Sequence, residues 1–206
     1  MKFENIKKNL IKAYDELAKD WSKGKSAEDW GLSELQEFAR LVGSGGKVLD
    51  LGCGAGVQSK QLRIEGMEVV GLDISPKMIQ FAQKKNPDCE FIVGDIENLN
   101  FDPGLFDGVY ARASLLHIKK RNISKVLANI SNILKKDGYL YLALKEGKGE
   151  KVIESEKYGK KVRRFFSFFS VPEISDYLSD AGFEVLSTNN WIGKDTNWIH
   201  LFARKV

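Results

Sequence analysis

The segment Val48–Gly56, which reads VLDLGCGAG, is the part of this 206-residue chain whose residue types point most directly to chemistry. Its apolar start predicts a buried strand, and glycines at positions 52, 54 and 56 predict a tight turn into a helix. Such a turn lets a ligand approach the backbone and presents amide N–H groups at a helix N-terminus. Val57 stands where the dinucleotide-binding fingerprint has its third glycine, which disfavours a nicotinamide or flavin enzyme. Taken alone, the pattern also fits a simple strand-to-helix turn.

Two acidic residues close the next two predicted strands. Asp73 follows the turn by about 20 residues, where a carboxylate can accept both hydroxyls of a ribose. The alternative for Asp73 is a helix-capping carboxylate beside Ser75. Asp95 ends the following strand, where a carboxylate and a backbone N–H can read an adenine edge between Ile74 and Met78.

Strands and helices alternate through most of the chain, which predicts a mostly parallel sheet with helices on both faces. We expect helices at 3–22 and 32–42, then strands at 47–51, 68–72, 90–93, 106–111 and 139–144 with helices between them. A capping box at Ser170 opens a late helix, and strands near 183–189 and 197–204 pair antiparallel across the 192–196 turn. We expect a single domain over 1–206, in which 1–42 form an N-terminal helical cap and 146–169 form a loop or hairpin near the acceptor site.

The composition, 43 % hydrophobic and 29 % charged, is that of a soluble globular protein. We expect a cytoplasmic protein without a membrane span, since neither a signal peptide nor a long apolar run is visible. Cys53 and Cys89 have no metal-site spacing, so no metal is expected, and a disulfide between them is possible but not favoured. The net charge of +4 is mild, and nucleic acid is not an expected partner. A monomer or a homodimer is expected.

Four segments in order resemble the successive motifs of class I S-adenosylmethionine-dependent methyltransferases. They are VLDLGCGAG, VVGLDIS, VGDIENL and FDGVYARASLLHI, and the likeness covers about residues 1–145 and continues loosely to the end. The resemblance implies a doubly wound α/β fold: a seven-stranded, mostly parallel sheet whose last strand is antiparallel, in a three-layer sandwich. It implies S-adenosyl-L-methionine as cofactor and S-adenosyl-L-homocysteine as product.

The resemblance also implies a set of cofactor-binding residues at the strand ends and on the N-terminal helix: Tyr14, Trp21, Asp50, Gly52, Cys53, Gly54, Asp73, Ile74, Met78, Asp95, Ile96, Ala111 and Arg112. The resemblance implies that Asp50 and the Gly52–Gly54 turn hold the amino acid end of the cofactor. Ala111 and Arg112 would line the methionine moiety near the sulfonium. For the two aromatic residues of the first helix, the alternative is core packing of an amphipathic helix.

His117 follows the fourth strand beside the expected methyl position and is the candidate general base. The alternative is a hydrogen-bonded histidine that fixes this loop. Tyr158, Arg164, Phe165 and Trp191 are the candidate acceptor-binding residues, because aromatic faces and cations suit a small aromatic or carboxylate-bearing acceptor. The alternative for the aromatic residues of this segment is a hairpin that faces the core.

The function that these features favour is methyl transfer from the cofactor to a small-molecule acceptor by in-line displacement. One alternative is a macromolecular methyltransferase that acts on tRNA or protein. Another is a non-catalytic protein that binds S-adenosylmethionine without turnover. A nicotinamide oxidoreductase would differ from all three by binding NAD(P) and not S-adenosylhomocysteine.

Overall fold

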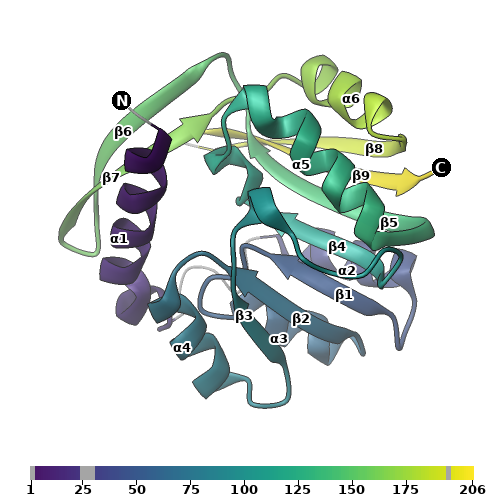
Figure 1. Ribbon diagram of the computed structural model, residues 1–206, viewed down its shortest axis with the longest axis horizontal. Helices are drawn as coiled ribbons and strands as arrows, with labels where there is room; N and C mark the ends of the chain where they lie inside the picture. Colours follow the sequence, from purple (N-terminus) through teal and green to yellow (C-terminus); the bar gives the residue numbers. More distant parts are fainter. Residues whose placement is uncertain (1–2, 24–30, 194–195) are drawn as a thin grey trace.

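A seven-stranded sheet forms the centre of the protein in the computed structural model, which describes residues 3–23, 31–193 and 196–206 (Figure 1). Across these residues the strand order is β3-β2-β1-β4-β5-β9-β8. The strands are β1 (Lys47–Leu51), β2 (Glu68–Asp73), β3 (Glu90–Val93), β4 (Phe106–Arg112), β5 (Leu134–Lys145), β8 (Phe183–Ile192) and β9 (Asn197–Lys205). Only β9 runs against its neighbours, pairing antiparallel with both β5 and β8. The predicted doubly wound fold is confirmed. Residues 194 and 195 of the predicted final turn lie outside the described residues.

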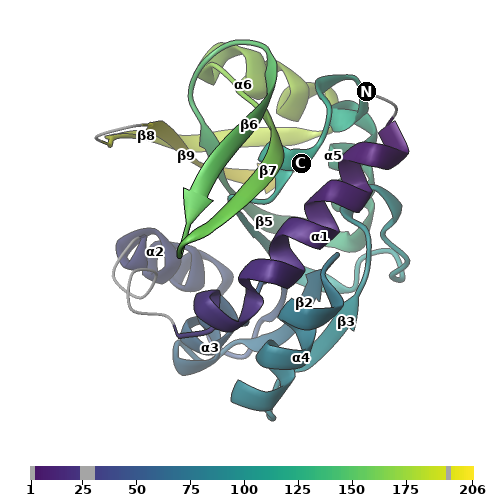
Figure 2. The ribbon, with the colours of Figure 1, turned by 90° about the vertical axis from the view of Figure 1, so that its left-hand side faces the viewer.

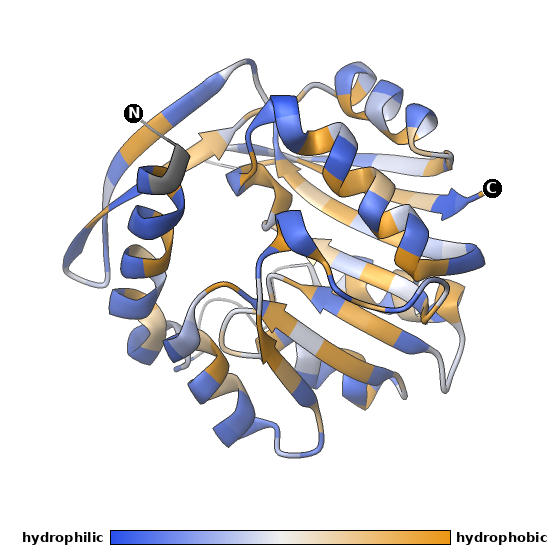
Figure 3. Cartoon of the chain, viewed as in Figure 1, coloured by the Kyte–Doolittle hydropathy of each residue, from blue (hydrophilic) through white to orange (hydrophobic). Residues whose placement is uncertain are grey.

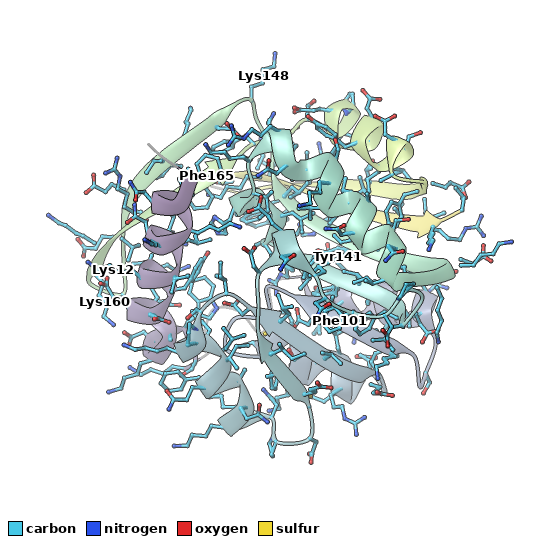
Figure 4. The ribbon with its side chains drawn as sticks, in the orientation of Figure 1. Lys12, Phe101, Tyr141, Lys148, Lys160 and Phe165 are labelled. Atoms are coloured by element: carbon cyan, nitrogen blue, oxygen red, sulfur yellow. The ribbon has the colours of Figure 1, made fainter. Side chains whose placement is uncertain are left out.

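Helices cover both faces of this sheet. On one face, α2 (Leu32–Val42) and α3 (Val57–Ile64) pack through Phe38 and Leu62 onto side chains such as Val48. On the other, α5 (Lys120–Ile133) and α6 (Val171–Asp180) pack onto side chains such as Leu49. Because successive strand residues point to opposite faces, one strand supplies both cores. Figure 3 shows the hydrophobic strands enclosed between helices whose outer sides are hydrophilic.

Two further helices contribute side chains to the end of the sheet where the parallel strands terminate. The first, α1 (Phe3–Trp21), packs against α4 (Pro76–Lys85), which begins at the predicted Ser75 cap and the proline in its first turn. Short 3-10 helices follow β3, as η1 (Ile96–Asn98), and β4, as η2 (Leu115–His117). These segments place their side chains at the carboxyl edge of the sheet.

The strand β5 begins earlier than the sequence pattern predicts. It starts at Leu134 directly after α5, but its pairing with β4 passes from Phe106↔Leu134 to Gly108↔Tyr139. The intervening residues form a bulge, in which Asp137 adopts a positive φ of 60°. The regular part of the strand therefore starts at Tyr139, the position that the Asp-Gly turn signal predicts.

The segment predicted as a loop or hairpin is a two-stranded hairpin of β6 (Glu150–Lys157) and β7 (Lys160–Ser167). Tyr158 and Gly159 join the strands with positive φ angles of 53° and 72°, as a two-residue hairpin turn requires. The hairpin packs on α1, where Lys160 Nζ donates to the carbonyl oxygen of Glu16 and to Asp20 at 2.6 and 2.9 Å. Figure 2 shows α1 and the hairpin lying side by side across the carboxyl edge of the sheet.

Candidate functional site

A cavity of about 450 Å³ lies at the carboxyl edge of the sheet, beneath α1 and the β6–β7 hairpin. Residues at or just after five strand ends line it: Gly52, Asp73, Asp95, Arg112 and Lys145. In open parallel sheets this edge is where ligands bind, because the loops there diverge around the point where strand order reverses. The strand order places that reversal between β1 and β4.

The glycine turn after β1 forms one wall of the cavity. Gly52 has a φ of 82°, and a Cβ there would lie 2.4 Å from the Cβ of Ser114, so this position requires glycine. The backbone N–H groups of Gly52 and Cys53 donate to the carbonyl of Leu72 at 2.7 and 3.0 Å. These bonds fix the turn against β2 and leave its backbone facing the cavity.

Asp73 lies at the centre of this wall and holds the glycine turn to the start of α4. One carboxylate oxygen accepts the backbone N–H of Gly54 at 2.9 Å, and the other accepts that of Ser75 at 2.8 Å. Burial raises the pKa of Asp73 to about 6, although these two backbone bonds favour the charged form. The carboxylate lines the cavity and has lone pairs left for hydroxyl donors.

Asp95 lies at the next strand end and is tied to the first helix. Its carboxylate accepts the backbone N–H of Glu97 at 2.9 Å and the Lys7 ammonium at 2.5 Å. Lys7 also pairs with Glu97 at 2.5 Å, and Asn122 donates to the same carboxylate. Lys7 and Glu97 also line the cavity. Neither residue was predicted from the sequence, because their pairing joins segments about 90 residues apart.

Most residues predicted to bind the cofactor line this one cavity: Tyr14, Trp21, Gly52, Cys53, Gly54, Asp73, Ile74, Met78, Asp95, Ile96 and Arg112. Asp50 and Ala111 do not. Asp50 is buried behind the turn, where it accepts the Ser59 hydroxyl at 2.6 Å and where burial raises its pKa to about 7. Ala111 faces the core beneath α5, because only the next residue along the strand points to the cavity. The structure therefore does not bring the side chains of Asp50 and Ala111 into the cavity.

His117 lines the cavity, but both of its ring nitrogens are engaged. Nδ1 lies 2.7 Å from the carbonyl oxygen of Phe165, which can only accept, so Nδ1 carries the proton and donates. Nε2 therefore accepts the Tyr14 hydroxyl, 2.7 Å away. Burial lowers the pKa of His117 to about 3, with smaller contributions from nearby cations. A base this weak, already bonded to a tyrosine, matches the loop-fixing alternative of the sequence analysis.

The far end of the cavity is aromatic and cationic. Three of the four predicted acceptor-binding residues line it: Tyr158, Arg164 and Trp191. Phe165 does not, because its side chain is buried on the opposite face of β7 from its lining neighbours and only its carbonyl reaches His117. This end is also lined by four residues that were not predicted from the sequence: Lys145, Lys157, Phe166 and Trp198.

The remaining histidine and the two cysteines are buried. His200 is buried in β9 and bonds the Tyr141 hydroxyl at 2.6 Å. Cys53 and Cys89 are free, buried thiols. Within the described ranges, no cluster of histidine, cysteine, aspartate or glutamate could hold a metal ion, and no helix is long and apolar enough to cross a membrane.

The sequence and the fold of this chain are similar to those of methyltransferases. A methyltransferase-domain family matches residues 48–138. An uncharacterised protein of Methanocaldococcus jannaschii is 29 % identical over 88 % of this chain and 79 % of its own length. A demethylmenaquinone methyltransferase of Beutenbergia cavernae is 31 % identical over 59 % of this chain, which spans half of that enzyme. The structure of 1,6-didemethyltoxoflavin-N1-methyltransferase from Burkholderia thailandensis, with its substrate and S-adenosylhomocysteine bound, superposes with a TM-score of 0.78 at 19 % identity, covering 100 % of this chain and 91 % of that one.

Proposed function

The chain belongs to the class I S-adenosylmethionine-dependent methyltransferase superfamily, and we propose that it transfers the methyl group of this cofactor to a small-molecule acceptor by in-line displacement. The observation that carries the proposal is a single cavity with two chemically different ends. The glycine turn, Asp73 and Asp95 line one end, and aromatic and cationic side chains line the other. A reaction between two bound molecules needs this continuity, because their reacting atoms must come within about 3 Å of each other.

The cofactor fits the first end by the chemistry of the residues there. In the proposal, the ribose hydroxyls donate to Asp73, whose two backbone bonds already hold it in place. The adenine lies between Ile74 and Met78, close to Asp95 and Ile96. The amino acid end lies on the backbone of the Gly52–Gly54 turn, where no Cβ occludes it. When bound, the cofactor supplies a methyl group already activated by the positive sulfur.

The chain itself orients the acceptor and excludes water. The first helix and the hairpin cover the cavity, and they are joined where Lys160 bonds Asp20 and Glu16. We propose that His117 is a positioning residue that holds Tyr14 with its hydroxyl at the junction of the two ends. In the proposal, His117 is too weak a base to take a proton from the acceptor, and the acceptor presents a lone pair that is free at working pH.

The test of the function uses cofactor with an isotopically labelled methyl group and a library of small-molecule acceptors. We expect labelled small-molecule product together with S-adenosylhomocysteine, and calorimetric binding of S-adenosylhomocysteine to the protein alone. Label that appears only in tRNA or protein fractions would support the macromolecular alternative. Tight binding without any labelled product across the library would support the non-catalytic one.

The role of His117 is tested with His117→Ala and Tyr14→Phe on the acceptor so found. A general base contributes about 10²–10⁴-fold to rate, so loss of a base would lower kcat by at least about a hundredfold and change its pH profile. A positioning role predicts a smaller loss with the pH profile unchanged. It also predicts a lower melting temperature for Tyr14→Phe, since a buried acceptor on His117 loses its donor at a cost of about 1–3 kcal/mol.

A further inference from the structure

Three cationic side chains converge on the acceptor end of the cavity: Lys145 from the end of β5, and Lys157 and Arg164 from the hairpin. Each lies over an aromatic ring. Lys145 Nζ is 4.4 Å from the centre of the Phe166 ring, and the Arg164 guanidinium is 5.2 Å from the same ring. Lys157 Nζ is 4.0 Å from the centre of the Trp21 ring. These contacts contribute about 0.5–2 kcal/mol each, but they supply no opposite charge to the three cations.

No carboxylate in the described part of the chain lies within ion-pair distance of Lys145, Lys157 or Arg164. Burial, together with the positive charges of Arg164 and Lys145, lowers the pKa of Lys157 to about 8. Burial and Arg164 lower the pKa of Lys145 as well. Grouping like charges in a half-buried site destabilises the empty protein, which is expected where a ligand supplies the opposite charge.

The two faces of the hairpin differ in their charge. On the outer face, cross-strand neighbours have opposite charge: Glu154 is paired with Arg163 and Glu156 with Lys161. Such pairs are the usual arrangement for a solvated hairpin surface. On the inner face, Lys157 and Arg164 line the cavity and no acid accompanies them in the described structure. The cationic cavity end is therefore not an extension of a generally basic hairpin.

The cavity end is also lined by aromatic rings, which suit a planar group. Trp21 and Tyr158 meet edge to face with their ring centres 6.5 Å apart, and Phe166 and Trp198 line the same end. Lys145 lies between the last two, 5.9 Å from the centre of the Trp198 ring. Aromatic faces interleaved with cations bind planar anions well, because the rings contact the apolar part while the cations contact the charge.

We propose that the methyl acceptor is an aromatic or similarly planar small molecule that carries an oxyanion, such as a carboxylate or phosphate, and that this anion binds between Lys145, Lys157 and Arg164. The inference rests on the proposed function for the identity of the site, and it specifies the class of acceptor. The cation cluster serves recognition of this anion.

The experiment compares two probes of the same shape, 2-naphthoate and 2-naphthamide, by titration calorimetry with S-adenosylhomocysteine saturating. We expect the carboxylate to bind at least about tenfold more tightly than the amide, as one charge-assisted contact provides. Lys145→Met and Lys157→Met should each reduce this preference at least threefold and leave amide affinity unchanged. Lys161→Met, on the outer face of the same hairpin, is the matched control and should leave both affinities unchanged. A 2-naphthyl phosphate arm distinguishes a phosphate-bearing from a carboxylate-bearing acceptor.

Equal affinity of the two probes for the unmodified protein, or no measurable binding of either, would overturn the inference. So would a preference that survives in both lysine variants. The comparison of probes on the unmodified protein stands even if a variant is unstable. Failure of the proposed function would appear in different measurements, as loss of S-adenosylhomocysteine binding or of methyl transfer. The difference in affinity between naphthoate and naphthamide measures neither of these.

Discussion

Cofactor affinity should depend on pH through Asp73. Burial raises the pKa of this carboxyl to about 6, and the ionised form accepts from ribose hydroxyls through both oxygens, whereas protonation turns one oxygen into a donor. We therefore expect S-adenosylhomocysteine to bind fully above pH 7 and to weaken as the pH falls through 6. Asp73→Asn removes the titration. It should also weaken binding at pH 7.5 at least about tenfold, or about 1.5–3 kcal/mol for lost charge-assisted bonds.

The expected magnitude follows from the ionised fraction. With a pKa of about 6, roughly nine-tenths of the Asp73 side chains are ionised at pH 7 and roughly one-tenth at pH 5. Affinity should then fall about tenfold between pH 7 and pH 5 if the cofactor binds the ionised form. His117, with a pKa of about 3, stays neutral throughout this range and does not contribute.

The assay is titration calorimetry with S-adenosylhomocysteine at half-unit steps from pH 5 to pH 7.5. Asp50 also titrates in this window, with a pKa of about 7, and it lies behind the glycine turn. Asp50→Asn is therefore the control, and it should keep the slope that we assign to Asp73. An affinity independent of pH in the unmodified protein, or the same slope in Asp73→Asn, would refute the placement of the ribose on this carboxylate.

Two further predictions concern stability. Gly52→Ala combines a φ of 82° with a Cβ 2.4 Å from that of Ser114, so it should lower the melting temperature and weaken S-adenosylhomocysteine binding. Gly45→Ala, with a similar φ of 81° but open space, should cost only the left-handed backbone penalty of about 1–2 kcal/mol and leave binding intact; equal effects of the two variants would argue against the steric account. Asp50 holds its proton to higher pH in the folded state than in the unfolded chain, so the free energy of unfolding should fall by up to about 4 kcal/mol as the pH rises from 4 to 7, and Asp50→Asn, which keeps the bond to Ser59, should flatten this slope in urea titrations. A slope unchanged in the variant would mean that other groups carry it.

The sheet and the glycine turn could be predicted because their signals are local. Apolar runs of strand length, a capped helix at Ser75 and glycines at three alternate positions each fix a few neighbouring residues. The same local reasoning also predicts that Asp50 and Ala111 do not line the cavity. Strand alternation puts Asp50 on the side of Val48, toward α3, and Ala111 on the side of Val109, toward α5.

The rest of the site depends on long-range packing that spacing does not encode. His117 forms hydrogen bonds with Tyr14 and Phe165, which lie 103 and 48 residues away in the sequence. Because of these two bonds, neither ring nitrogen of His117 is available as a free base. The position of Lys145 and Lys157 in the cavity could not be predicted, because it depends on how the hairpin packs over the strand ends. The alternating side chains of the hairpin predict its two strands. No sequence pattern predicts which surface of the protein the hairpin covers.

The helix α1 contacts both halves of the cavity. Lys7 bonds Asp95 at one half, while Tyr14 bonds His117 and Trp21 lies beneath Lys157 at the other. A ligand that shifts this helix from either side therefore changes the affinity for its counterpart, and thermodynamic linkage makes the factor equal in both directions. We therefore expect occupancy of the proposed nucleoside half and of the proposed anion half to be coupled through α1.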